Sequence, residues 1–351
     1  MRRLIIADIK SPQLNGVSTG HFFAVARNYY EMFHDVIKTM VSGGPVYQNQ
    51  FKDVLLQLPN DILNTKDSIW KSKLKYFQNS IELFKETEGD IVVIQQGGVL
   101  TSFVAMSLFY KKNSRMFLIQ YSKEGVNHPL KRLLYKIVRN KIDGIICPND
   151  DVGKAYERPY CVVPDYIYTG NYLCPRKTYE EKNYDVCFVG RIEEEKGILE
   201  VARKIAGTNY KMIIAGKVSF KWIANELKNI CDGCANIELK IGYVPDEEYY
   251  SYIHNSRFCI LNYQGEYSRR SSGVVLDIIF NDVPIIGKRC QALRFIEENR
   301  IGYIYDNLED LDLSHILTKD YYYSCIREIA IYKRKHEEYK KKLADFIGIA
   351  Q

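Results

Sequence analysis

The sequence predicts an α/β protein of two domains, each built on a parallel sheet with helices on both faces. Its 351 residues exceed the usual size of a single domain. Apolar runs of strand length alternate with segments of helical periodicity in both halves. A polar, proline-bearing stretch at 166–183 separates the halves. We therefore expect domains at 1–165 and 184–318, a linker at 166–183, and a C-terminal helix at 319–351 that packs back on the first domain.

The first half begins with an apolar strand at 4–7, followed by a glycine-bearing loop at 11–20. Each later strand is a short apolar run between turn residues, as expected for strands buried on both faces. Each helix has apolar residues at helical spacing. On these grounds we expect strands at 36–41, 91–94, 116–119, 142–147 and 161–163, and helices at 21–33, 69–84, 99–110 and 129–140.

The second half repeats this alternation. Strands are expected at 186–189, 210–215, 236–241, 258–261 and 283–286, and helices should follow near Ile198, Phe220, Glu247, Gly273 and Leu293. A long charged helix is expected at 321–346. Two such domains joined by one linker should enclose a cleft, which is the default ligand site.

Composition favours a soluble protein of a reducing compartment, the cytoplasm. Hydrophobic residues make up 46% of the chain, enough for complete cores. The nine cysteines are scattered, and several lie in apolar runs, where a reduced cysteine acts as a small hydrophobe. The lone Cys231-Asp-Gly-Cys234 favours a surface loop over a metal or redox site. No signal peptide is recognisable, and the weakly polar run at 97–110 is too short for a bilayer span.

Positive charge is concentrated in the first half. Residues 1–165 hold 22 Lys+Arg and 16 Asp+Glu, a net charge of +6, whereas the remainder is neutral. The predicted helix at 130–140 carries Lys131, Arg132, Lys136 and Arg139 opposite Leu133, Leu134, Ile137 and Val138. It is either an ordinary amphipathic helix on its own sheet or a contact with anionic lipid. Nucleic-acid binding is disfavoured, because no aromatic–basic recognition motif is present.

The stretch 185–197 predicts a phosphate site. Its strand ends at Gly190, and Arg191 and Lys196 flank an acidic loop before Gly197 opens a helix. Ligands of open α/β sheets bind beyond the carboxyl ends of the strands, so two cations there suit a pyrophosphate. The alternative is that both cations merely pair with Glu193–Glu195.

A second stretch, 267–287, predicts the other half of such a site. Ser271 or Ser272 is a suitable N-cap, and Gly273 allows close backbone approach to a ligand. The amides of the following helix, which includes Val274 and Val275, form a ready anion site. Asp277 lies about one turn inside, where it could accept hydroxyls of a ribose. The alternative is an ordinary capped helix.

Together these motifs resemble the retaining glycosyltransferases of family 4, which have the GT-B fold of two Rossmann-like domains facing a central cleft. The resemblance rests on four motifs in the family's order: Gly190-Arg191-Ile192 with Glu195-Lys196-Gly197, Ala215-Gly216, residues 241–248, and Leu276-Asp277-Ile278 with residues 282–286. The first half matches more loosely, through the loop of Gly16 and through Val163-Pro164-Asp165.

The resemblance implies a sugar bound to a nucleoside diphosphate, UDP or GDP, and neither metal nor cofactor. Arg191, Lys196 and the amides of 272–274 would hold the diphosphate, and backbone near Tyr243 and Val244 would read the base. Gly16 would let the first domain approach donor or acceptor. The acceptor would be a glycan or a polyprenyl-diphosphate-linked saccharide in cell-surface polysaccharide assembly, reached peripherally at the inner face of the cell membrane.

The chain departs from the family pattern at two catalytic positions. The family's first glutamate would fall at Arg269, so Glu266 is the candidate substitute, while Asp277 replaces the second glutamate. The family's active-site histidine is replaced by Gln120 and Tyr121, for which His21 and His128 are possible compensations. These departures leave two alternatives open: a sugar-nucleotide 2-epimerase, and a non-catalytic homologue that binds sugar nucleotides.

Other motifs carry less weight. A dehydrogenase is disfavoured because no G-x-G-x-x-G follows the first strand. Asp310-Leu-Asp312 and Asp150-Asp151 could be mistaken for metal ligands, but oxygen-ligand sites need several converging groups. A helix-capping role or a connecting segment is the better interpretation of both.

Overall fold

The computed structural model describes residues 2–14, 16–18, 21–63, 67–96, 98–170, 177–269 and 272–349. The chain divides into two compact units. Unit 1 comprises Met1–Thr169 together with Glu337–Gln351, and unit 2 comprises Gly170–His336. The last helix, α14 (Lys319–Ile347), contributes residues to both.

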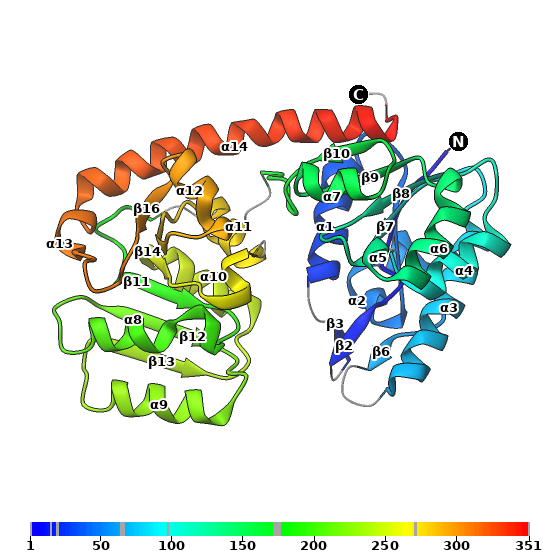
Figure 1. The fold of residues 1–351 in the computed structure, drawn as a ribbon. Coiled ribbons are helices and arrows are strands. Elements are labelled where there is room, and N and C mark those ends of the chain that lie inside the picture. Colours follow the sequence, from blue (N-terminus) through cyan, green and yellow to red (C-terminus); the bar gives the residue numbers. More distant parts are fainter. Residues whose placement is uncertain are drawn as a thin grey trace. The chain divides into compact units, whose positions relative to one another are not determined.

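Unit 1 is built on a seven-stranded sheet in which every neighbouring pair is parallel (Figure 1). In order across the sheet the strands are β10 (Tyr160–Val162), β9 (Gly144–Cys147), β8 (Arg115–Ile119), β7 (Ile91–Gln95), β1 (Leu4–Ala7), β4 (Thr39–Gly43) and β5 (Leu55–Gln57). A smaller sheet is formed by β3 (Val17–Ser18), β2 (Pro12–Leu14) and β6 (Ile62–Leu63).

Helices cover both faces of the larger sheet. The helical segments of unit 1 are α1 (His21–Phe33), α2 (Gln48–Phe51), α3 (Ile69–Glu86), α4 (Leu100–Phe109), α5 (Glu124–Asn127), α6 (Pro129–Val138) and α7 (Asp150–Ala155), with 3-10 turns η1 (Pro45–Tyr47), η2 (Lys52–Val54) and η3 (Arg139–Lys141). Residues of β1 alternate between two cores, because successive side chains of a strand point to opposite faces. One core contains α1 and the end of α14, and the other contains α3, α4 and α6.

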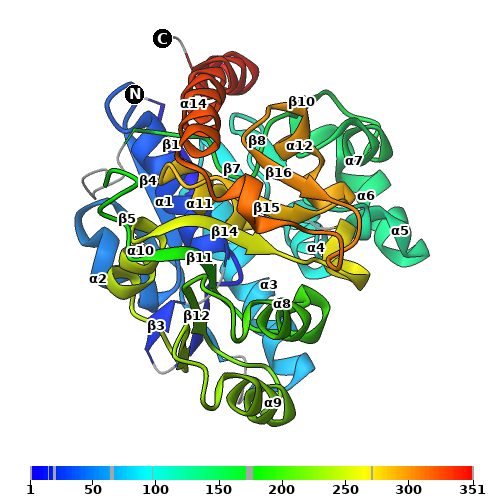
Figure 2. The ribbon, with the colours of Figure 1, turned by 90° about the vertical axis from the view of Figure 1, so that its left-hand side faces the viewer.

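Unit 2 is built on a six-stranded parallel sheet. Its order is β13 (Ile237–Ile241), β12 (Met212–Gly216), β11 (Tyr184–Val189), β14 (Ser256–Leu261), β15 (Ile285–Lys288) and β16 (Gly302–Tyr305). Figure 2 shows β11, β14 and β15 side by side in this sheet. Its helical segments are η4 (Glu194–Lys196), α8 (Ile198–Ile205), α9 (Lys221–Cys231), α10 (Asp246–His254), η5 (Gly265–Arg269), α11 (Gly273–Phe280), η6 (Gln291–Leu293), α12 (Arg294–Glu298), α13 (Leu313–Ile316) and the first part of α14.

The end of α14 packs on unit 1, as the sequence predicts. Leu343, Ala344 and Ile347 are fully buried in the core beside α1. The Phe346 ring packs edge-on against Phe117 of β8 at 5.5 Å between centroids, and Arg115 donates to the Ile347 carbonyl at 3.0 Å. The predicted α/β fold, including this returning helix, is confirmed.

Most predicted elements fall within two residues of their positions, and the larger differences have local causes. The strand expected at 36–41 begins only at Thr39, because the Val36 and Ile37 amides bond to the Phe33 carbonyl and close the end of α1. The strand expected at 283–286 is Ile285–Lys288. The small sheet, β5 and β16 are not predicted from the sequence.

Described residues of the predicted linker at 166–183 make specific contacts within each unit. Asn28 of α1 forms two hydrogen bonds with the Ile167 backbone, at 2.7 and 3.0 Å, which fix Ile167 in the core of unit 1. Within unit 2 the Tyr179 ring lies 4.4 Å from the Arg257 guanidinium, and the buried Lys182 ammonium donates to two backbone carbonyls at 2.9 Å.

Candidate active site

The phosphate-site motifs of unit 2 lie at a topological switch point. β11 and β14 are neighbours, and the chain proceeds outward from them in opposite directions, to β12 on one side and β15 on the other. Ligands of open α/β sheets bind beyond the carboxyl ends of strands at such a point. The segments that leave these two strands meet there, since η4 contacts η5.

Glycines allow the backbones at this edge to approach closely. A Cβ on Gly216, at the end of β12, would lie 1.7 Å from the Gly190 carbonyl oxygen. Gly197 has a φ of 61°, and a Cβ there would lie 2.4 Å from atoms of Asn262. A Cβ on Gly190 would lie 3.1 Å from the Val274 side chain, so the loop after β11 also touches the start of α11. Three motifs that are distant in sequence thus converge.

Lys196 is the central charge of this edge. Lys196 is only 4% exposed. Its ammonium lies 5.1 Å from the centre of the Tyr267 ring, and it makes no hydrogen bond or ion pair with the residues that the structure describes. Burial lowers the pKa of Lys196 to about 8, although the nearby Glu193 carboxylate opposes this shift. A buried cation without a direct anionic partner indicates a site for an anion from outside the chain.

Arg191 pairs locally, unlike Lys196. Its Nε lies 2.6 Å from Glu193 Oε1 and donates to Ser219 Oγ at 3.1 Å, while the side chain is 67% exposed. Burial raises the pKa of Glu193, but hydrogen bonding by Tyr267 and the charge of Arg191 outweigh it and leave that pKa below its usual value. Of the two interpretations of these cations, local pairing therefore applies to Arg191. It does not apply to Lys196, which has no ion pair among the described residues.

The start of α11 offers open amides. Ser272 is the N-cap residue, but its side chain does not cap the helix. Its hydroxyl instead lies 2.9 Å from the Tyr263 hydroxyl. Ser272 is thus the N-cap residue, one of the two predicted positions, but a neighbouring tyrosine takes its hydroxyl. Ser271 lies outside the described residues. The amides of Gly273 and Val274 remain available to a ligand, while the Val275 amide bonds to the Ser272 carbonyl at 3.1 Å.

Asp277 is held one turn into α11. The Tyr249 hydroxyl donates to its carboxylate at 3.3 Å. Burial raises the pKa of Asp277 to about 7, partly offset by the Tyr249 hydrogen bond and reinforced by Asp246. Near neutral pH the group can therefore both accept and donate hydrogen bonds to hydroxyls.

The remaining predicted residues are more exposed. Gly242 follows β13, and its amide bonds to the Gly216 carbonyl at 3.0 Å, which places the loop of Tyr243 and Val244 at the same sheet edge. Tyr243 is 77% exposed, and Val244 is half-buried. Glu266 is exposed on η5. Gly16 lies in unit 1, in the turn between β2 and β3, with a φ of 77°.

Sequence reasoning missed a polar group in unit 1. β1 and β7 form the switch point of its sheet, and they end at the buried Asp8 and Gln95. Both amide atoms of Gln95 lack hydrogen-bond partners among the described residues, although the residue is fully buried. The sequence signal was a polar residue directly after an apolar strand at 4–7 and again at 91–94.

The expected histidine position in unit 1 is occupied by a buried glutamine. Gln120 accepts from the Tyr156 hydroxyl at 3.0 Å, while its amide nitrogen is buried without a partner among the described residues. His128 caps α6, since its ring nitrogen accepts from the Leu130 amide at 3.3 Å. His21 begins α1, and its side chain lies outside the described residues.

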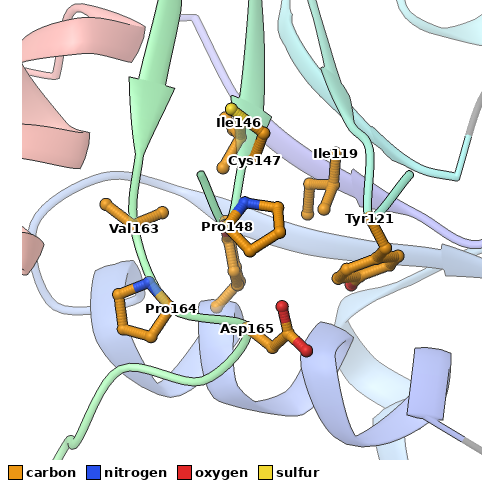
Figure 3. A pocket seen from close by; sticks show the side chains of 9 residues that line it. Ile119, Tyr121, Ile146, Cys147, Pro148, Val163, Pro164 and Asp165 are labelled. Atoms are coloured by element: carbon orange, nitrogen blue, oxygen red, sulfur yellow. The ribbon is translucent and has the colours of Figure 1, made fainter. Parts of the chain in front are cut away.

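A small cavity lies at the same end of β8, β9 and β10. Figure 3 shows the Asp165 carboxylate directed toward Tyr121 across it. Burial raises the pKa of Tyr121 well above its usual value, and the Asp165 charge adds to this shift. The cavity volume of about 10 Å³ corresponds to a single water molecule. This cavity is therefore too small for a sugar.

The residues considered as metal ligands have other roles. Asp312 caps α13 by accepting from the Ser314 amide at 2.9 Å, and Asn149, rather than Asp150, caps α7. Cys234 donates to the Ile230 carbonyl at the end of α9. Within the described part of the chain, no three His, Cys, Asp or Glu side chains gather as they would around a metal ion.

Solved structures match the chain over almost its whole length. Trehalose-6-phosphate synthase OtsA is 11% identical, with 99% of each chain covered and a TM-score of 0.71. The α,α-trehalose-phosphate synthase (UDP-forming) of Burkholderia xenovorans, in complex with glucose-6-phosphate, is 10% identical, with 99% of this chain and 100% of that chain covered and a TM-score of 0.66. HepE of Anabaena, in complex with UDP-glucose, is 11% identical, with 99% and 100% covered and a TM-score of 0.61.

No protein-family model and no curated protein sequence matches the chain. The structural matches therefore define the fold. The chain has the GT-B fold, as the sequence predicts, and shares it with these solved structures.

Proposed function

We propose that the protein is a retaining glycosyltransferase that moves a hexose-type sugar from a UDP or GDP sugar to a glycan or a polyprenyl-diphosphate-linked acceptor, without a metal ion. The observation that carries this proposal is the buried Lys196 ammonium, which has no ion pair among the residues that the structure describes. It lies at the edge where the Gly190 loop touches α11. A cation and open helix amides at one sheet edge are what a diphosphate requires.

In this proposal the diphosphate binds between Lys196, Arg191 and the amides of Gly273 and Val274. Asp277 binds the ribose, and the loop of Tyr243 and Val244 faces the base. Glu266, on η5 beside η4, is the proposed contact of the transferred sugar.

Catalysis follows from charge development on the leaving group. As the bond from the sugar C1 to the outer phosphate oxygen breaks, negative charge builds up on that phosphate. A preorganised cation and helix amides stabilise this charge more in the transition state than in the ground state. The departing phosphate can accept the proton of the attacking hydroxyl, and attack from the same face retains the configuration at C1.

The first test of this function is a nucleotide panel. A ligand that binds only the folded state raises its apparent stability, so we expect one of UDP, GDP, ADP and dTDP to raise the melting temperature at submillimolar concentration. The matching sugar nucleotide should release free nucleoside diphosphate when an acceptor is added. Epimerised donor would instead support the isomerase alternative, and binding without turnover would support the non-catalytic one. If no nucleotide stabilises the protein, the proposal fails.

We further propose that unit 1 supplies the acceptor site, at the edge where β1 and β7 end. A buried amide without hydrogen bonds is costly and is retained where a ligand uses it. Gln95 offers both a donor and an acceptor to sugar hydroxyls, and the amide nitrogen of Gln120 offers a second donor. Asp8 follows β1 next to Gln95 in the register of β1 and β7. Burial raises the pKa of Asp8, and the Tyr47 hydroxyl donates to its carboxylate at 2.7 Å.

Replacing Gln95 with methionine should separate stability from activity. Methionine keeps the length of the side chain and removes the unpaired amide, so the variant should be more stable by about 1–3 kcal/mol. The KM for the acceptor should rise about tenfold or more, with the donor KM unchanged. Chemical unfolding and initial rates would measure both. A stabilised variant with an unchanged acceptor KM would remove Gln95 from the acceptor site.

A further inference from the structure

Helix α6 turns three large apolar side chains toward solvent. Tyr135 and Val138 of this helix are buried. In contrast, Leu130, Leu133 and Ile137 are 49%, 58% and 60% exposed. Their spacing of three and four residues places them on one face of the helix. The predicted apolar face of α6 is therefore divided: Val138 is buried, as expected for a helix packed on its own sheet, whereas Leu133 and Ile137 are exposed.

Other exposed apolar side chains lie on the neighbouring helices. α3, α4 and α6 cover the same face of the sheet, with α4 in contact with both others (Figure 1). Leu108 at the end of α4 is 67% exposed, and the Lys141 ammonium bonds to the Ser107 carbonyl at 2.8 Å, which ties the end of α6 to this point. We define the outer helix surface by the exposed side chains Trp70, Leu74, Leu108, Leu130, Leu133 and Ile137.

This surface lies in the most basic part of the chain. Residues 98–141 contain nine Lys+Arg and one acid, Glu124, a net charge of 9 − 1 = +8. The whole chain carries +6, so the remainder is −2. Residues 68–81, which begin α3, add three lysines, of which Lys71 and Lys75 pair with Asp67 at 3.2 and 2.6 Å. One of the cations of α6, Arg139, pairs with Glu157 at 2.9 Å, but Lys136 is exposed and has no ion pair among the described residues.

We propose that the outer helix surface binds the surface of an anionic lipid bilayer. Aliphatic side chains and a tryptophan among lysines match the chemistry of an interfacial contact, in which apolar groups enter the acyl boundary and cations meet the headgroups. A second copy of this chain is a poorer partner, because two faces of the same positive charge would meet. Among the described residues no helix has both the length and the apolar character to cross a bilayer, so the contact is peripheral.

This surface would bring the protein to a membrane-linked acceptor, so the inference rests on the proposed function. Vesicle binding can nevertheless be measured without sugar transfer. The full-length protein would be sedimented with vesicles of phosphatidylglycerol and phosphatidylcholine in equal amounts, and with vesicles of phosphatidylcholine alone. We expect binding to the anionic vesicles only, weakened by added salt. The double variant Leu133→Gln, Ile137→Gln should bind about tenfold less, because it removes two apolar side chains from the contact. It should still fold, because both side chains are more than half exposed.

A matched control is the double variant Phe220→Gln, Trp222→Gln at the start of α9 in unit 2. Phe220 and Trp222 are 59% and 47% exposed. This control should bind vesicles like the wild type. The proposal would be overturned if the Leu133, Ile137 variant bound vesicles as well as the wild type does, or if the wild type did not bind anionic vesicles. It would also be overturned if the wild type were a dimer without lipid and this variant a monomer, because the surface would then bind a second copy of the chain. Vesicle binding without any transfer would instead overturn the proposed function, and transfer to a water-soluble acceptor without vesicle binding would overturn only this surface.

Discussion

Replacing Lys196 with methionine is expected to lower turnover about 10²–10³-fold, the usual cost of removing one preorganised group from developing negative charge. The ammonium is buried and lacks an ion pair within the described structure, so its full charge is available to the diphosphate. Arg191→Ala should lower turnover less than Lys196→Met does, because Arg191 is 67% exposed and already pairs with Glu193. In that variant kcat should fall more than the donor KM rises. Initial-rate measurements with each variant would establish this order.

The fold should tolerate Lys196→Met. The folded pKa of Lys196 is about 8 instead of 10.5, so the charged group opposes folding by about 3 kcal/mol below pH 8. This opposition fades as the pH rises from about 8 to 10.5. At neutral pH the methionine variant should therefore melt at the same temperature as the wild type or higher. A variant that is folded and turns over within a few-fold of the wild type would remove Lys196 from the mechanism.

The same shift predicts a pH profile. At low donor concentration kcat/KM reports the free enzyme, and the ammonium needed for the diphosphate is lost above pH 8. We expect kcat/KM for the donor to fall about tenfold per pH unit on the alkaline side. Lys196→Arg keeps its charge there and should move the fall to higher pH. A wild-type profile that is flat to pH 9.5 would contradict the role of this charge.

The strands of both sheets could be predicted because parallel strands buried on both faces are continuous apolar runs. The runs 91–94 and 116–119 lie within β7 and β8. Two strands were missed because they are edge strands with partly exposed side chains: β5 is Leu-Leu-Gln and β16 is Gly-Tyr-Ile-Tyr. Such short segments have no apolar run to separate them from loops.

Residue types at the site could be predicted, but their environments could not. Arg191 and Lys196 flank one loop and look equivalent in sequence, yet only Lys196 is buried, because the adjacent Gly197 packs against Asn262, the residue after β14. The Ser272 hydroxyl is taken by Tyr263, nine residues earlier in the chain. The outward face of α6 depends on how the helix is rotated on the sheet, which its periodicity alone does not fix.

Gly216→Ala is expected to destabilise unit 2 more than any surface change. Gly216 ends β12 with a φ of 156°, and its carbonyl accepts from the Gly242 amide at 3.0 Å. A methyl group there would lie 1.7 Å from the Gly190 carbonyl oxygen, so the backbones of two central strands would have to separate. Backbone strain and forced repacking each cost about 1–3 kcal/mol, which gives about 2–6 kcal/mol in total.

Gly207→Ala is the matched control for this prediction. Gly207 also has a positive φ, 71°, but a Cβ there meets nothing within 4 Å. The Gly207→Ala substitution should lower the free energy of unfolding only by the strain of the left-handed conformation, about 1 kcal/mol. Urea unfolding of both variants measures the difference, which isolates the contact between Gly216 and Gly190 from backbone strain. Because this contact positions the loop of Lys196, Gly216→Ala should also lose donor binding under conditions where it is still folded. Equal stability of the two variants would mean that the close approach of β12 to Gly190 does not hold the donor loop in place.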